Sequence, residues 1–160
     1  MISTQHLPIY ENYQITPKLE AAEAINRIIR GEISAVEAYK KTLEKITNRP
    51  ERERLGEIKK FHEEQVSHWM EQVDSKGLTP DTESGPWGSV VKSLVGVANF
   101  IGDSPSLIAL EQGEFHGLRE YNNFLENDFV SHRNKAYVKD TVIPHLELHT
   151  VSLKALKKLH

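Results

Sequence analysis

Two glutamates occupy equivalent positions in a short segment that occurs twice in the chain. Residues 31–39 begin with Gly-Glu and end with Tyr, and residues 113–121 repeat this spacing. In both copies the apolar residues recur at helical steps, which predicts that Glu32 and Glu114 lie within the buried stripe of a helix. A buried carboxylate is costly unless it is paired, protonated or bound to a cation. The pair therefore predicts a polar site inside a bundle of helices.

The helix predicted at residues 51–74 offers four side chains that could complete a cation site with these glutamates. In carboxylate-bridged metal bundles, two helices each give one Glu and the other two each give Glu-x-x-His, with both side chains on one face. No regular Glu-x-x-His occurs here. The main candidate is His68. The weaker candidates are His62, Glu64 and Gln65, the last placing a neutral amide where the carboxylate should be.

The helix predicted at residues 129–159 offers a pair of histidines. His145 and His149 are four residues apart and therefore share a face. Imidazole and carboxylate ligands suit a divalent ion such as iron, zinc or manganese, whereas a di-iron centre that activates oxygen needs bridging carboxylates, which these helices lack. We predict no catalytic residue. The predicted metal ligands are Glu32, Glu114, His68, His145 and His149.

The same residues also allow an interpretation without metal. The glutamates would then accept hydrogen bonds from Tyr39, Tyr121 or a histidine. In that case His145 and His149 would be a hydrogen-bonded pair in the core. Each tyrosine follows its glutamate by about two helical turns, which favours a place beside the site over a direct chemical role. The glycines before the glutamates predict a close approach of the two helices.

Four long helices, arranged as two antiparallel hairpins, are predicted to position these side chains. Thr16-Pro17 and Ser104-Pro105 each place a capping residue before a proline, which is typical of a helix start. Pro144 lies inside the last helix and predicts a kink near Asp140, because proline removes a hydrogen bond and clashes with the preceding turn. The predicted helices cover residues 17–47, 51–74, 105–126 and 129–159.

The segment between the hairpins is too long for a simple turn. Residues 75–104 contain several glycine and proline turn signals, and residues 87–101 have the pattern of a short apolar helix. We expect a partly helical crossover along the bundle, and the alternative is an independent helix packed over one end. The predicted fold is an all-α four-helix bundle at residues 17–160, preceded by an arm at residues 1–16.

The composition narrows the function classes. The chain has 160 residues and a net charge of −3, which is too small a charge to attract nucleic acid. It has no cysteine, which excludes disulfides, thiolate zinc sites and thiol catalysis. No stretch approaches about 18 apolar residues, and no signal peptide is recognisable, so we expect no membrane span and a cytoplasmic location.

Three features of the sequence resemble the ferritin-like superfamily. They are the paired Gly-Glu…Tyr segments, the Gly-Pro-Trp-Gly at residues 85–88 with Gly102-Asp103 after it, and Pro144 followed by His149. Within that superfamily the sequence looks most similar to a bacterial family labelled as a domain of unknown function. The resemblance covers about residues 17–159. It implies a ferritin-like bundle, often dimeric, with a central metal site and a stress-related role. The ligands that it implies are Glu32, Glu114, His68 and His149.

Two functions are compatible with these features. The first is a metal-binding four-helix-bundle protein with a role in stress or iron handling, expected to form a homodimer. The alternative is a non-enzymatic stress-response or interaction module that keeps the helical architecture without the metal site. Metal content and its dependence on the two glutamates distinguish them.

Overall fold

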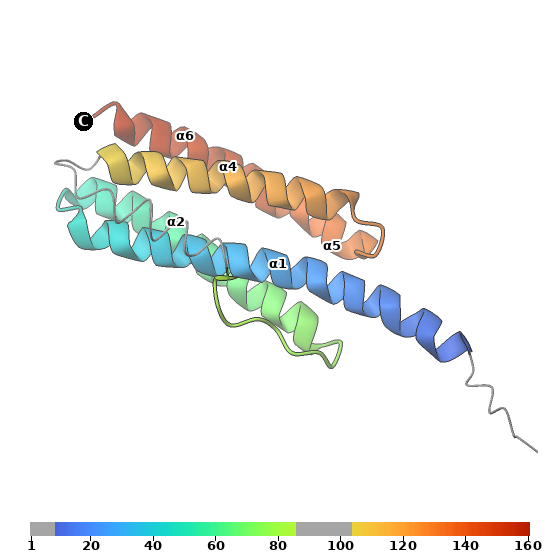
Figure 1. Ribbon diagram of the computed structural model, residues 1–160. Helices are drawn as coiled ribbons and strands as arrows, with labels where there is room; N and C mark the ends of the chain where they lie inside the picture. Colours follow the sequence, from blue (N-terminus) through green and yellow to red (C-terminus); the bar gives the residue numbers. More distant parts are fainter. Residues whose placement is uncertain (1–8, 86–103) are drawn as a thin grey trace, which may run out of the picture.

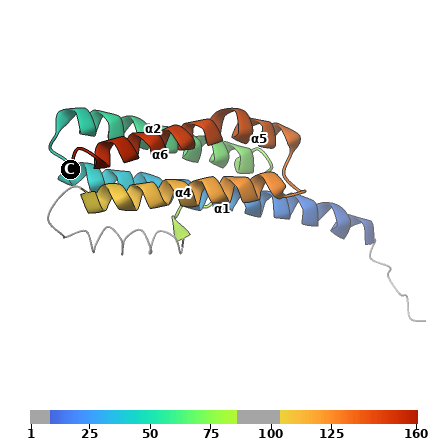
Figure 2. The same ribbon diagram turned by 90° about the horizontal axis from the view of Figure 1, so that it is seen from above.

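The structure is a computed structural model that describes residues 9–85 and 104–160, apart from the side chains of residues 9–16 and 104. Within these ranges the chain forms helices, turns and loops and no strand, which confirms the predicted all-α class. The long helices lie side by side in Figure 1, and Figure 2 shows the same bundle from above. No helix in the described ranges has the length and apolar character needed to cross a membrane.

Two helical hairpins make up the bundle. The first pairs α1 with α2, the second pairs α4 with a helix that ends in α6, and α1 also packs against α4. The last helix is continuous but has three parts, named α5, η1 and α6 (Figure 1). The bounds are α1 (Ile9–Lys45), α2 (Arg49–Asp74), α4 (Ser104–Glu126), α5 (His132–Tyr137), η1 (Val138–Val142) and α6 (Ile143–Lys157).

The helices α2 and α4 start within two residues of their predicted starts, whereas α1 starts earlier than predicted. Asn48 caps α2, because its side chain accepts a 3.1 Å hydrogen bond from the backbone N–H of Glu51. α4 spans Ser104–Glu126, within one residue of the predicted range 105–126. The predicted start at Pro17 is wrong, since the chain is already helical at Ile9 and the proline lies inside α1. Pro17 is exposed there, so a carbonyl left without a helical partner can bond water.

The predicted crossover helix at residues 87–101 lies outside the described residues. The described part of the connection, residues 75–85, runs back along α1 (Figure 1). Arg30 of α1 forms an ion pair with Asp81, and Asn26 Oδ1 accepts a 3.0 Å hydrogen bond from the backbone N–H of Asp81. These contacts attach the segment to the first hairpin.

The last helix is irregular where Pro144 predicts it to be. A π-helical turn, η1, precedes the proline, and the N–H of Ile143 bonds the carbonyl of Val138, five residues back. A π-turn adds one residue to a helix and so re-aims the side chains that follow it. The distortion predicted near Asp140 therefore takes the form of a π-turn, which sets the orientation of α6.

The apolar core consists of two clusters, one toward each end of the bundle. Burying each large apolar side chain contributes about 1.5–3 kcal/mol. The first cluster contains Ile25, Ile28, Ile29, Trp69, Val73, Tyr121, Phe124, Val130, Val138, Val142 and Leu146. The second contains Ala38, Tyr39, Ile46, Leu55, Ile58, Leu107, Leu110 and Leu153. On each of the four long helices, residues of the two clusters flank two buried polar positions.

Candidate metal centre

Four buried polar side chains, one from each long helix, lie between the two apolar clusters. They are Glu32 of α1, His62 of α2, Glu114 of α4 and His149 of α6, with exposed fractions of 4%, 3%, 3% and 6%. Each residue lies on the apolar face of its helix. The same periodicity that places apolar side chains in the core therefore places these polar side chains in the interior. Groups this polar are buried only where partners satisfy them.

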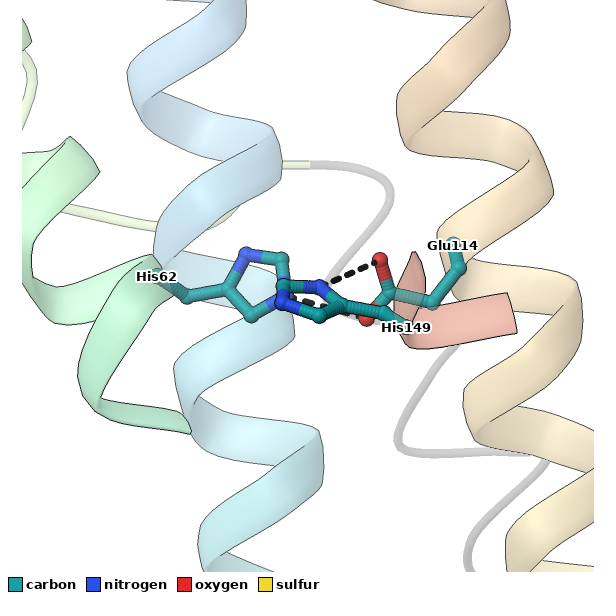
Figure 3. A group of neighbouring side chains, drawn as sticks. All are labelled: His62, Glu114 and His149. Carbon is teal, nitrogen blue, oxygen red and sulfur yellow. Dashed lines mark hydrogen bonds and ion pairs between the residues drawn. The ribbon is translucent and has the colours of Figure 1, made fainter. Parts of the chain in front are cut away.

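His62 lies at the centre of this site. Its Nδ1 is 2.6 Å from Oε2 of Glu32, and its Nε2 is 3.0 Å from Oε1 of Glu114. His149 approaches the other oxygen of Glu114, with Nδ1 3.3 Å from Oε2. In Figure 3 the two imidazoles point toward one another and toward the Glu114 carboxylate. A carboxylate oxygen only accepts, so each of these ring nitrogens donates, and His62 carries both of its protons.

The two tyrosines of the repeat bind the glutamates in a crossed arrangement. The hydroxyl of Tyr39 donates to Oε1 of Glu114 at 2.5 Å, and that of Tyr121 donates to Oε1 of Glu32 at 2.6 Å. Each copy of the repeat therefore supplies the hydrogen bond for the other copy's carboxylate. The indole N–H of Trp69 donates to the Tyr121 hydroxyl at 3.0 Å, which fixes that hydroxyl toward Glu32.

Burial and charge shift the pKa values of these groups in opposite directions. Burial lowers the pKa of His62, but the charges and hydrogen bonds of Glu114 and Glu32 outweigh it and raise the pKa to about 10. Burial raises the pKa of Glu114, but the charge of His62 and the hydrogen bonds from the two histidines lower it to about 2. Burial, reinforced by the glutamates, raises the pKa of Tyr39 and Tyr121 well above the usual range.

Three of these groups can hold a metal ion. One ligand atom each from His62, Glu114 and His149 lies within 4.8 Å of the others, and all three residues are buried. Glu32 bonds Nδ1 of His62, so Nε2 remains the nitrogen that can bind an ion. A carboxylate behind a ligating imidazole fixes its orientation and increases its basicity. The site therefore has the ligand types, the burial and the supporting hydrogen bond of a protein metal site.

The other predicted ligands lie outside this cluster. His68 is half-buried and stacks on Tyr137 at a ring distance of 4.0 Å, and its Nε2 has no hydrogen-bond partner within the described chain. Gln65 is buried and accepts a 3.1 Å hydrogen bond from Tyr137. Glu64 is exposed. His145 is exposed as well, with Nδ1 2.7 Å from the carbonyl of Thr141.

His62 was the weaker candidate from sequence, yet α2 places it in the centre and His68 away from it. The residues of α2 that are buried include Leu55, Ile58 and His62, at steps of three and four. This stripe is the signal that identifies His62, because the step continues the apolar face directly. Ranking by the Glu-x-x-His spacing favours His68 instead, which faces Tyr137.

The repeated glycines border a cavity, which corrects the prediction of a close helix approach. A Cβ built on Gly31 or Gly113 would meet no atom within 4 Å beyond the neighbouring residues and the helix's own backbone. A cavity of about 50 Å³ lies between α1 and α4, and its lining includes both glycines together with Glu32 and Glu114. The small residues leave open space beside the carboxylates, and the two helices do not close over it.

No protein-family profile, curated protein or solved structure matches the chain. The geometry and chemistry of this site are therefore the basis for a proposed function.

Proposed function

We propose that the protein is a metal-binding four-helix-bundle protein that holds one divalent cation at its centre. The observation that carries this proposal is the convergence of His62, Glu114 and His149, three buried ligand groups from three helices, within 4.8 Å. Two imidazoles and one carboxylate suit zinc, iron or manganese, and three protein ligands leave a coordination position open. Glu32 acts behind His62 and holds its ring.

The ferritin-like architecture is part of this proposal. The internal repeat supports it, since each copy contributes one glutamate to the centre. The directions of the helices support it too, because α2 and α4 run the same way in Figure 1, the arrangement that a crossover along the bundle requires. The glutamates of the two Glu-x-x-His motifs are missing, which favours one bound ion over a carboxylate-bridged pair. The homodimer and the stress-related role remain predictions from the resemblance.

A second candidate function is an interaction module without metal. The observation that favours it is the charge balance of the site, since protonated His62 bridges the two glutamates in the place where a cation would lie. Such a network satisfies buried carboxylates without an ion. The two functions differ in whether a divalent ion displaces a proton from His62.

Metal binding to the purified protein tests the proposal. We expect the chelator-treated protein to bind one equivalent of Zn²⁺, Mn²⁺ or Fe²⁺ in a calorimetric titration. His149→Ala and Glu114→Ala should weaken that binding by about 100-fold or more, since even a residue behind a ligand is worth about 10–100-fold. The bound ion should also raise the melting temperature by mass action, and this rise should vanish at low pH, because protons compete with the ion for its ligands.

An exposed histidine provides the matched control. His132 lies at the start of α5 and is exposed, so His132→Ala removes an imidazole without touching the site and should bind metal like wild type. Helical content by circular dichroism shows that each variant is folded. A wild-type protein that binds none of the three ions would refute the proposal, as would unchanged binding in both ligand variants.

A further inference from the structure

A groove between α2 and α6 leads from solvent to the proposed metal centre. Its volume is about 310 Å³, and its lining includes His149 at the inner end, the exposed His145 and the ring of Phe61. His149 therefore belongs both to the buried cluster and to the groove. The groove encloses more space than the cavity between α1 and α4, which measures about 50 Å³ and also borders the centre.

Each of the two histidines of α6 has an acceptor at Nδ1, although their rings are inclined at 67° to one another. Nδ1 of His145 faces the carbonyl of Thr141 at 2.7 Å, and Nδ1 of His149 faces the carboxylate of Glu114 at 3.3 Å. Both partners only accept, so both Nδ1 atoms carry a proton, and Nε2 is the nitrogen of each ring that can bind an ion. An imidazole with Nδ1–H fixed by an acceptor is prepared to bind a metal ion through Nε2.

The ring of Phe61 holds these histidines in place. It stacks on His145 with ring centres 4.6 Å apart and meets His149 edge-on at 5.1 Å. It also contacts His62 edge-on at 5.9 Å. His145 and His149 are themselves 6.5 Å apart between ring centres, on successive turns of α6. An ion bound at His145 is therefore close to the imidazole of His149, the next possible ligand toward the centre.

Two carboxylates and two cationic side chains line the groove in exposed ion pairs. The carboxylates are those of Glu57 and Glu64, and they face Arg54 at 3.2 Å and Lys60 at 3.9 Å. These pairs are exposed, so solvent screens them and the carboxylates remain available to a passing ion. The opposite opening, between α1 and α4, is lined by small residues and also by Glu32, His62 and Glu114 of the centre, so it is the competing route for an ion.

We propose that the groove between α2 and α6 is the path by which the divalent cation reaches the buried centre, with His145 as its first protein ligand. The proposal rests on the proposed metal-binding function. His145, which lies outside the cluster of His62, Glu114 and His149, would then bind the ion only in passing. A residue on the path changes the rates of entry and exit by the same factor and leaves the binding equilibrium unchanged.

The rate of Co²⁺ uptake by the metal-free protein tests the path. Stopped-flow absorbance follows Co²⁺ binding, and a chelator then measures its release. We expect His145→Ala to slow both uptake and release about tenfold, within the range that variants of one interface show, with a dissociation constant within about twofold of wild type. His145→Phe keeps an aromatic ring beside Phe61 and should be equally slow, because it lacks the nitrogen ligand.

The opposite opening supplies the matched control. Ala109→Leu narrows the cavity between α1 and α4 and should leave the uptake rate unchanged.

Slow uptake in Ala109→Leu with wild-type rates in both His145 variants would overturn the path. A lower affinity in His145→Ala would also overturn it, since His145 would then bind the resident ion. If wild type takes up Co²⁺ and the His145 variants match its rates, only the path fails. If wild type binds no Co²⁺, Zn²⁺, Mn²⁺ or Fe²⁺, the proposed function fails with it.

Discussion

At the scale of single residues, the central feature is an imidazole between two carboxylates. His62 donates from both ring nitrogens, to Glu32 and to Glu114, and so carries a positive charge in the interior. A divalent cation in the same place would satisfy Glu114 and release the proton on Nε2. The site therefore favours a positive charge. The metal titration shows whether a proton on His62 or a divalent ion supplies it.

Removing each tyrosine hydroxyl measures how much its hydrogen bonds contribute to stability. Tyr39→Phe should lower the free energy of unfolding by about 2 kcal/mol, because a buried hydrogen bond to a charged carboxylate is lost. Tyr121→Phe should cost about 1 kcal/mol more, because the indole N–H of Trp69 loses its acceptor as well. Urea unfolding of the metal-free variants measures both values.

Tyr137 gives the control for this pair. Its hydroxyl donates to the neutral amide of Gln65 in a half-buried position, so Tyr137→Phe should cost only about 1 kcal/mol. Equal losses in Tyr39→Phe and Tyr121→Phe would contradict the proposed role of the Trp69 contact.

The choice among the histidines shows what could be predicted at this scale. The periodicity of α1 and α4 was sufficient to place Glu32 and Glu114 inside, because burial of a helix face is a local property of the sequence. The choice of His62 over His68 was not, because a spacing motif carried over from regular metal bundles outweighed the apolar stripe. The exposure of His145 depends on how α6 turns after the π-helical segment, which the sequence predicts only as an irregularity.

At the scale of helices, the internal repeat produces a site with approximate twofold character. Each copy gives a glutamate and a tyrosine, and the tyrosine of one copy bonds the glutamate of the other. The second helices of the hairpins break this symmetry. α2 gives His62, which reaches both carboxylates, whereas α6 gives His149, which reaches only Glu114. The shared ion is therefore expected nearer to Glu114 than to Glu32.

The glycines of the helices provide a prediction about stability. Gly31→Ala and Gly113→Ala should each raise the free energy of unfolding by about 0.5–1 kcal/mol, because alanine favours the helix and its Cβ enters open space. Thermal and urea unfolding of the metal-free protein measure the change. A loss of stability would mean that the space beside the carboxylates is not open.

Gly85 is the contrasting position for this experiment. Its φ of +63° is strained for other residues, and an added Cβ would lie 2.8 Å from Cδ of Arg30. Gly85→Ala should therefore lower the free energy of unfolding by about 1–3 kcal/mol. A neutral or stabilising effect would show that the segment at residues 75–85 does not hold this conformation against α1.

At the scale of the whole molecule, a charged centre lies between two apolar clusters, and the stability of the metal-free protein should depend on pH accordingly. The pKa of His62 rises from 6.5 to about 10, so its contribution is full below pH 6.5 and is lost as pH rises through 10. The pKa of Glu114 falls from 4.5 to about 2, so its contribution is full above pH 4.5 and is lost as pH falls through 2.

The melting temperature of the metal-free protein should therefore be highest between about pH 4.5 and pH 6.5. Differential scanning calorimetry from pH 2 to pH 10 measures it. In Glu114→Gln both slopes should flatten, because the amide neither titrates nor raises the pKa of His62. A wild-type melting temperature that climbs steadily from pH 6.5 to pH 9 would contradict the charged state of His62.

The sequence by itself determined the all-α class, the hairpins and the inward position of two repeated glutamates. These features depend on periodicity, capping and turn residues, which act over a few neighbouring positions. Only the tertiary structure decided which histidines meet the glutamates, how the tyrosines cross between the copies and where solvent reaches the centre. Those features depend on the rotation and spacing of helices that are distant in sequence, and the packing of their side chains fixes both.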